Sequence, residues 1–384
     1  MEYWVWLQCC LRYGNPRATA ILDAFTDAIS IYKADKETLV NSRLFTKTEL
    51  VRLCNKSLKE ANDIISECKE NNINILTFAD KCFPNGLRNI VDFPFVLYYK
   101  GILPDFNTLP TICIVGPRDC SEFGIKAAFS LSARLSRGGF TVVSGGAKGV
   151  DSAAHNGALK QTAKTVAILP CGICYDYLKE NEKLRMKIIE KGCIMSEFPP
   201  TYPLKMGAFQ IRNRLMSGIA LGTAIIEADE RSGALITARC ATEQGRDVFV
   251  IPGNPTMPQY KGSNLLLRDG AKPLLTAMDI FEEYLLTYRD KIDIEKAFAH
   301  TENIEETNLE KNVGNNSQTI NNRCVTGVSL VAKTIYESAP DEPFCVDELS
   351  VFNNYNASEL MTALAELELF GYIKAVPGGR YVKI

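Results

Sequence analysis

Ser144-Gly145-Gly146-Ala147-Lys148-Gly149-Val150-Asp151 is a glycine-rich stretch between an apolar segment, 141–143, and a segment with the length and spacing of a helix, 152–159. Glycines at a strand-to-helix turn let backbone N–H groups approach an anion, and the helix N-terminus adds about half a positive charge. Lys148 adds a full charge. The stretch therefore predicts a phosphate site built from Gly145, Gly146, Lys148 and Gly149. The alternative interpretation is a glycine-rich turn with a solvated lysine.

The stretch differs from the common nucleotide-binding loops. No G-x-x-x-x-G-K-[ST] pattern can be read through it, and no G-x-G-x-x-G follows the first strand of this region. Because those loops are what hold ATP phosphates and dinucleotides, we predict no cofactor. The chain has two histidines, and Cys171–Cys174 has no second C-x-x-C to complete a zinc site, so we also predict no metal.

Short apolar runs alternate with helical segments on both sides of the stretch. The candidate strands are Ile112–Val115, Thr141–Val143, Thr165–Leu169, Cys193–Met195, Ala224–Ile226 and Val248–Ile251. The candidate helices between them include Gly124–Arg137, Ser152–Leu159 and Ala234–Gln244. This alternation indicates a parallel sheet covered on both faces, so we predict a doubly wound α/β domain that ends near Tyr284. Ligands of such sheets lie beyond the carboxyl ends of the strands.

Two further motifs place basic side chains at the carboxyl ends of these strands. Gly116-Pro117-Arg118 lies at the end of the first strand. An arginine there can bind a phosphate through two hydrogen bonds or stack on a base. The alternative interpretation is a surface ion pair. Phe209-Gln210-Ile211-Arg212-Asn213-Arg214 opens a helix, where the Asn213 amide suits a base edge and the two arginines suit phosphates. Exposed arginines at a helix start are common, so this second motif is less specific.

Two other side chains are interpreted as structural. Glu227 follows a strand, where a carboxylate can bind a metal or a ribose, but no partner site accompanies it. His155 could be paired with Ser144 in a hydrolase, but the chain lacks G-x-S-x-G, and packing on a helix face is the preferred interpretation.

The pattern of apolar, polar and charged residues along the chain predicts four parts. Residues 1–72 show apolar clusters at helical spacing and predict a small helical domain, and residues 73–288 hold the α/β pattern. Residues 289–323 are rich in asparagine and acids and predict a flexible linker. Residues 324–384 read as short helices followed by a hairpin, the pattern of a winged helix. Basic side chains exceed acidic ones only in the middle of the chain, so a polyanion should prefer that part.

Composition excludes several classes of protein. The chain of 384 residues has a formal net charge of −2, which excludes a protein that is basic throughout. No apolar run approaches the length of a membrane span, and the first residues do not resemble a signal peptide. The thirteen scattered cysteines favour reduced thiols, so we predict a cytoplasmic protein.

Taken in order, these motifs resemble the DNA-processing protein A family, DprA, also called Smf. The family pattern runs G-S-R, S-G-G-A-x-G-I-D, R-N-R, S-G-A-L-I-T-A and V-P-G. The corresponding segments are Gly116–Arg118, Ser144–Asp151, Arg212–Arg214, Ser232–Ala238 and Ile251–Gly253. The resemblance covers nearly the whole chain.

The resemblance implies an extended Rossmann-like domain that binds single-stranded DNA, forms a homodimer and loads the recombinase RecA in natural transformation or DNA processing. It implies single-strand binding protein as a further partner. It makes Arg118 and Lys148 DNA contacts and adds Asp151 to the site. Pro117, Gln210, Cys174 and Leu178 depart from the family pattern, which predicts a differently tuned pocket that keeps its two main cations.

Three other functions compete with a non-enzymatic strand binder. One is a generic nucleotide-binding sensor, which would require that no polynucleotide binds. Phosphoribohydrolases share a Rossmann-like fold, but their P-G-G-x-G-T-x-x-E loop is missing from the sequence. A duplex-DNA regulator would make the winged helix primary, and the acidic surplus of the tail argues against this.

Overall fold

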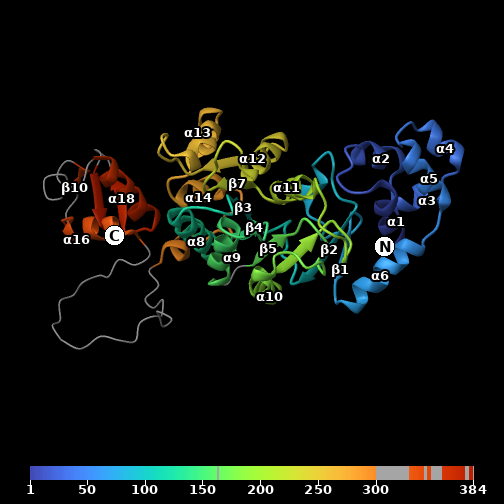
Figure 1. The fold of residues 1–384 in the computed structure, drawn as a ribbon, viewed down its shortest axis with the longest axis horizontal. Coiled ribbons are helices and arrows are strands. Elements are labelled where there is room, and N and C mark those ends of the chain that lie inside the picture. The colour runs from blue at the N-terminus through green and yellow to red at the C-terminus, as the bar shows by residue number, and fades with distance from the viewer. Residues whose placement is uncertain (162–163, 300–327, 341–343, 347–356, 377–379, 384) are drawn as a thin grey trace. The chain divides into compact units, whose positions relative to one another are not determined.

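The computed structural model describes residues 1–161, 164–299, 328–340, 344–346, 357–376 and 380–383. The chain divides into two compact units, Met1–Asp293 and Ile294–Ile384, which are described separately (Figure 1). Among the described residues, no helix is long and apolar enough to cross a membrane.

The first unit is built on a nine-stranded sheet with the order β1-β2-β6-β5-β4-β3-β7-β8-β9. The strands are β1 (Asn74–Thr77), β2 (Val96–Gly101), β3 (Thr111–Val115), β4 (Thr141–Ser144), β5 (Thr165–Ile168), β6 (Cys193–Ser196), β7 (Gly222–Ile225), β8 (Asp247–Val250) and β9 (Lys272–Pro273). The strands β6, β5, β4, β3, β7, β8 and β9, given in their order across the sheet, pair in parallel with their neighbours. The predicted doubly wound α/β sheet is confirmed, and each predicted strand lies within two residues of its observed bounds.

Helices cover both faces of this sheet, as Figure 1 shows. One set comprises α8 (Glu122–Arg137), α9 (Val150–Leu159), α10 (Glu182–Lys191) and α14 (Met278–Tyr284), and the opposite set comprises α11 (Ala208–Ile219) and α12 (Gly233–Glu243). The strands β3 to β7 are buried along nearly their whole length, because both faces are covered. α13 (Lys261–Arg268) lies between β8 and β9 in the chain, and α7 (Asn85–Arg88) between β1 and β2.

The strand order reverses at β3, which has β4 on one side and β7 on the other. Segments that follow these three strands therefore meet at one edge of the sheet, where doubly wound folds bind ligands. Gly116 follows β3, Gly145 follows β4 and Glu227 lies two residues beyond β7. The topology alone thus gathers three of the regions singled out in the sequence.

The N-terminal helices pack onto the antiparallel edge formed by β1 and β2. They are α1 (Glu2–Leu11), α2 (Ala18–Phe25), α3 (Ala28–Lys33), α4 (Lys36–Asn41), α5 (Lys47–Asn55) and α6 (Lys59–Glu70). Trp4 of α1 contacts the rings of Phe78 and Phe95, and the helices share one hydrophobic core with the sheet. The boundary predicted between residues 72 and 73 stays a prediction, because both parts belong to one compact unit.

The second unit contains α15 (Ile294–Phe298), α16 (Leu330–Ser338), α18 (Ala357–Leu369) and a three-stranded antiparallel sheet in the order β10-β12-β11. Its strands are β10 (Phe344–Cys345), β11 (Ile373–Val376) and β12 (Arg380–Lys383). α15 lies inside the range predicted as a linker, and residues 300–323 of that range lie outside the described residues. The winged helix stays a prediction, since residues 347–356 and 377–379 also lie outside them.

Candidate nucleic-acid interface

The glycine-rich loop between β4 and α9 is shaped by glycines with positive φ. Gly146 has φ +67° and Gly149, which precedes α9, has φ +74°, a conformation that L side chains rarely adopt. A β-carbon at Gly149 would overlap the carbonyl oxygens of Pro117 and Arg118. The loop after β3 is therefore seated directly on the glycine-rich loop, and this contact brings Arg118 to the predicted phosphate site.

Arg118 is exposed, and its guanidinium lies 5.2 Å from the centroid of the Phe209 ring. Phe209 is half-buried in the first turn of α11. The Arg212 guanidinium lies 5.9 Å from the same centroid, so the ring contacts both arginines, and the exposed Arg118 guanidinium stays available to a phosphate. The sequence motif begins at Phe209, but no role in the site was predicted for its ring.

Lys148, the second predicted cation, is exposed and has a partner in the structure. Its Nζ lies 2.8 Å from Oε1 of Glu180, in the short 3₁₀ helix η1 (Lys179–Asn181). Hydrogen bonding to Lys148 lowers the pKa of the Glu180 carboxyl. This pair could not be predicted from the sequence, because Glu180 lies 32 positions after Lys148.

Asp151 lies beneath the loop. Its buried carboxylate accepts a hydrogen bond from the Ala147 N–H at 3.3 Å, and burial raises its pKa. A carboxylate in this position orders the loop backbone and does not offer a positive contact to a phosphate. Its place in the family motif is thus explained by loop structure.

Arg212 also lies beneath the loop. Its guanidinium packs so closely under Gly145 that a β-carbon there would overlap it, and its Nη1 donates to the Ile168 carbonyl at 3.0 Å. Burial lowers the pKa of Arg212, and the charge of Asp151 acts in the opposite direction. The structure thus places a buried positive charge behind the loop rather than on its surface.

Arg214 faces a different set of partners. It forms a buried ion pair with Glu197, and its Nε lies 3.2 Å from a carboxylate oxygen of Asp92. Glu197 also accepts the Gly14 N–H at 3.2 Å, so this cluster ties the N-terminal segment to α11. Asn213 is buried as well, and its Oδ1 has no hydrogen-bond partner among the described residues.

Glu227 holds the other end of the loop that carries Arg118. Its carboxylate accepts hydrogen bonds from the N–H and hydroxyl of Ser121, the N-cap of α8, and from the Tyr260 hydroxyl at 3.2 Å. Glu227 is fully buried, which agrees with its interpretation as structural.

His155 lies in the core, where its Nδ1 is 2.8 Å from the Thr165 hydroxyl and burial lowers its pKa to about 3. Of the C-x-x-C cysteines, Cys171 is buried and Cys174 is exposed, and both are free thiols. None of these residues assembles with a second titratable group into an acid and base pair at the glycine-rich loop.

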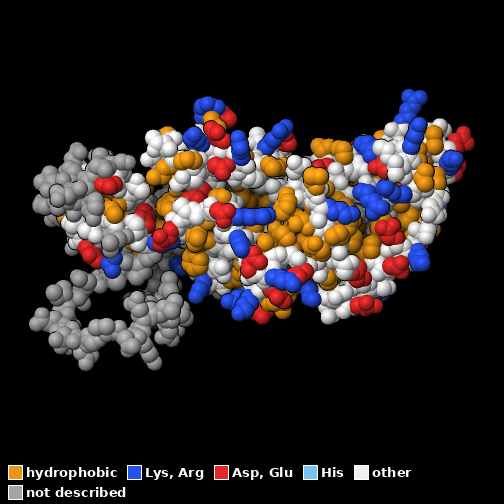
Figure 2. Space-filling view, viewed as in Figure 1, with side chains coloured by type: hydrophobic (Ala, Val, Ile, Leu, Met, Phe, Trp, Pro, Cys, Tyr) orange, Lys and Arg blue, Asp and Glu red, His pale blue; other side chains and the backbone are white. Residues whose placement is uncertain are grey.

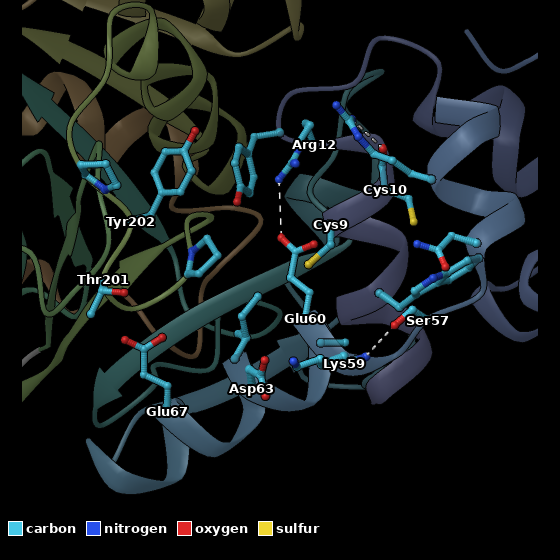
Figure 3. A pocket seen from close by; sticks show the side chains of 18 residues that line it. Cys9, Cys10, Arg12, Ser57, Lys59, Glu60, Asp63, Glu67, Thr201 and Tyr202 are labelled. Carbon is cyan, nitrogen blue, oxygen red and sulfur yellow. Dashed lines mark hydrogen bonds and ion pairs between the residues drawn. The ribbon is translucent and has the colours of Figure 1, made fainter. Parts of the chain in front are cut away.

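A cavity of about 890 Å³ lies elsewhere, between α1, α6 and residues 199–203. Figure 3 shows Glu60, Asp63 and Glu67 along α6 at this cavity, opposite Thr201 and Tyr202. Three basic side chains line the same cavity, so its charges balance and it has no surplus of positive charge to attract a polyanion. Figure 2 shows basic and acidic side chains interspersed on the visible face, which favours a local anion site over a continuous basic surface.

Comparison with known proteins identifies the family. The profile of DNA recombination-mediator protein A matches residues 74–285. The DNA processing protein DprA of Streptococcus pneumoniae is 39% identical over 209 residues, which cover 54% of this chain and 73% of the relative.

Two solved structures resemble the fold. The X-ray structure of DprA from Streptococcus pneumoniae has a TM-score of 0.65 and 28% identity, and the match covers 74% of this chain and 98% of that one. A structure that describes the single-stranded DNA binding mode of DprA from Helicobacter pylori has a TM-score of 0.51 and 28% identity, over 56% of this chain and 97% of that one. With its glycine-rich loop, its strand order and these matches, the chain belongs to the DNA recombination-mediator protein A family.

Proposed function

We propose that the protein is a non-enzymatic single-stranded DNA-binding recombination mediator. The main support for the proposal is the contact of Gly149 with the Pro117–Arg118 backbone, which brings an exposed arginine beside the glycine-rich loop that bears Lys148. Backbone N–H groups, two cations and the Phe209 ring together suit a phosphate and its neighbouring base. The likeness to the Helicobacter pylori protein supports the same ligand.

Binding at this site should depend on the phosphate backbone and on stacking rather than on base sequence. Such sites lose affinity as salt rises, because each neutralised phosphate releases counterions. Fluorescence anisotropy with single-stranded and duplex oligonucleotides of one sequence, over a series of salt concentrations, tests this. We expect tighter binding to the single strand; equal affinity for the duplex would contradict the proposal.

The mediator part of the proposal is that the protein acts in the cytoplasm as a homodimer, in natural transformation or DNA processing, and helps RecA assemble on single strands coated by single-strand binding protein. Two linked sites raise the effective concentration of the second contact, so a dimer holds long strands better than short ones. A symmetric dimer needs a self-complementary patch that leaves both loops open.

Two measurements test the mediator part. Light scattering should give the mass of a dimer at micromolar concentration, and RecA filaments should form faster on coated strands when the protein is added. A monomer with no effect on filament formation would leave only a DNA binder.

A further inference from the structure

The segment 178–181 lies against the glycine-rich loop. The Asn181 side-chain amide donates hydrogen bonds to the Gly146 carbonyl at 3.0 Å and to the Ser152 hydroxyl at 3.1 Å. The Ser152 hydroxyl in turn donates to the Ala147 carbonyl at 2.6 Å. Asn181 therefore fixes this segment beside the loop, and the preceding residue, Glu180, is held within reach of Lys148.

The carboxylate of Glu180 forms an ion pair with the amino group of Lys148. The two charged atoms are 2.8 Å apart, and the side chains are 45% and 56% exposed. Arg118 differs, because among the described residues it has no carboxylate within ion-pair distance. Of the two cations that define the site, one is open to a phosphate and the other already binds an anion of this same chain.

We propose that Glu180 is an intramolecular competitor that a DNA phosphate must displace from Lys148. The inference rests on the proposed single-strand binding. When a strand binds, the carboxylate–ammonium contact is exchanged for a phosphate–ammonium contact, and Glu180 is left in solvent beside a new negative charge. Glu180 therefore weakens the bound state without touching the strand, and Lys148 contributes less net attraction than an unpaired lysine.

The size of the effect follows from the exposure of the pair. Solvent-exposed ion pairs are weak, so removal of the competing charge should tighten binding by about two- to fivefold. The salt dependence should change as well. A lysine freed from its carboxylate neutralises one more phosphate, which steepens the slope of log affinity against log salt by up to about 0.7 for a single strand.

The test uses Glu180→Gln in the full chain, with Glu182→Gln as the matched control. Glu182 is exposed two residues further on, so the control removes the same charge without removing the pair with Lys148. Affinity for an oligothymidylate is measured by anisotropy over a salt series, and thermal unfolding confirms that each variant is folded. Lys148→Gln and the Lys148→Gln, Glu180→Gln double variant complete a thermodynamic cycle.

We expect Glu180→Gln to bind more tightly with a steeper salt slope, Glu182→Gln to match the wild type, and Glu180→Gln to add nothing once Lys148 is replaced. An equal gain in both single glutamate variants, or a gain that persists without Lys148, would overturn the competitor role. If the wild type binds the strand and Lys148→Glu does not, the proposed function stands. A wild-type affinity in Glu180→Gln would then refute only the competitor role of Glu180. Absence of binding by the wild type and all variants refutes the proposed function and this inference with it.

Discussion

Gly149 packs against the backbone of Arg118 so closely that no side chain could stand between them. This contact joins the loop after β3 to the loop after β4 and fixes the position of the exposed guanidinium relative to the loop amides. The binding site is therefore a property of two packed loops rather than of either motif alone.

Gly149→Ala should consequently lower both stability and affinity. The alanine would have to adopt φ +74° and would overlap two carbonyl oxygens, at a cost of roughly 2–4 kcal/mol in the free energy of unfolding. Gly245→Ala is the control, since Gly245 has φ +66° but no atom near a β-carbon, and should cost about 1 kcal/mol. Equal losses in urea unfolding would show that the loops are not packed as described.

Phe209→Ala should weaken binding to single strands while Phe209→Tyr should not. The alanine removes the cation–π contact that holds the Arg118 guanidinium, worth about 0.5–1 kcal/mol at an exposed site, whereas the tyrosine keeps the ring under Arg118. Anisotropy measures both variants on the same oligonucleotide. An alanine variant with wild-type affinity would remove Phe209 from the site.

Arg214→Ala should act on stability rather than directly on DNA. Its removal leaves Glu197 as an unpaired buried carboxylate, which costs about 3–5 kcal/mol in the free energy of unfolding. Arg239→Ala removes an arginine from an exposed ion pair with Glu243 and should leave the free energy of unfolding close to that of the wild type. If Arg214→Ala unfolds like the wild type in urea but loses DNA, the arginine is a strand contact.

His155 should make the protein less stable in acid. Burial lowers its pKa to about 3, below its ordinary value of 6.5, so only the unfolded chain takes up this proton between those two values. Stability from this group is present above pH 6.5 and falls by about 1.4 kcal/mol for each pH unit below it, until about pH 3. Urea unfolding of the wild type and His155→Gln between pH 7 and pH 5 measures this; identical pH dependences would contradict the burial of a neutral imidazole.

Much of the sheet could be predicted because a parallel strand buried on both faces leaves a direct signal. Runs such as Ile112–Val115 and Thr165–Leu169 have almost no polar residue, and their alternation with helices gave the α/β class. The antiparallel pairing of β2 with β6 was not predicted, because it joins residues almost a hundred positions apart.

The site was harder to predict because its geometry comes from tertiary contacts. The sequence indicated Arg118 and Lys148 from motifs next to strands, and both are exposed at the same pair of loops. It could not show that Arg212 and Arg214 are buried, since arginine is usually exposed and their partners, such as Glu197, come from other elements. It also could not place Glu180 on Lys148, because nothing in the local sequence brings that segment to the loop.

The central claim is that single strands bind at the loops that carry Arg118 and Lys148. Its most direct test is the anisotropy of one labelled oligonucleotide with the wild type, Arg118→Glu, Lys148→Glu and Lys36→Glu, where Lys36 is an exposed lysine on α4. We predict that the first two variants lose affinity, because each removes a cation and adds a charge that repels phosphate, and that they unfold like the wild type, while Lys36→Glu binds normally. Wild-type affinity in both Arg118→Glu and Lys148→Glu, or an equal loss in Lys36→Glu, would contradict the account.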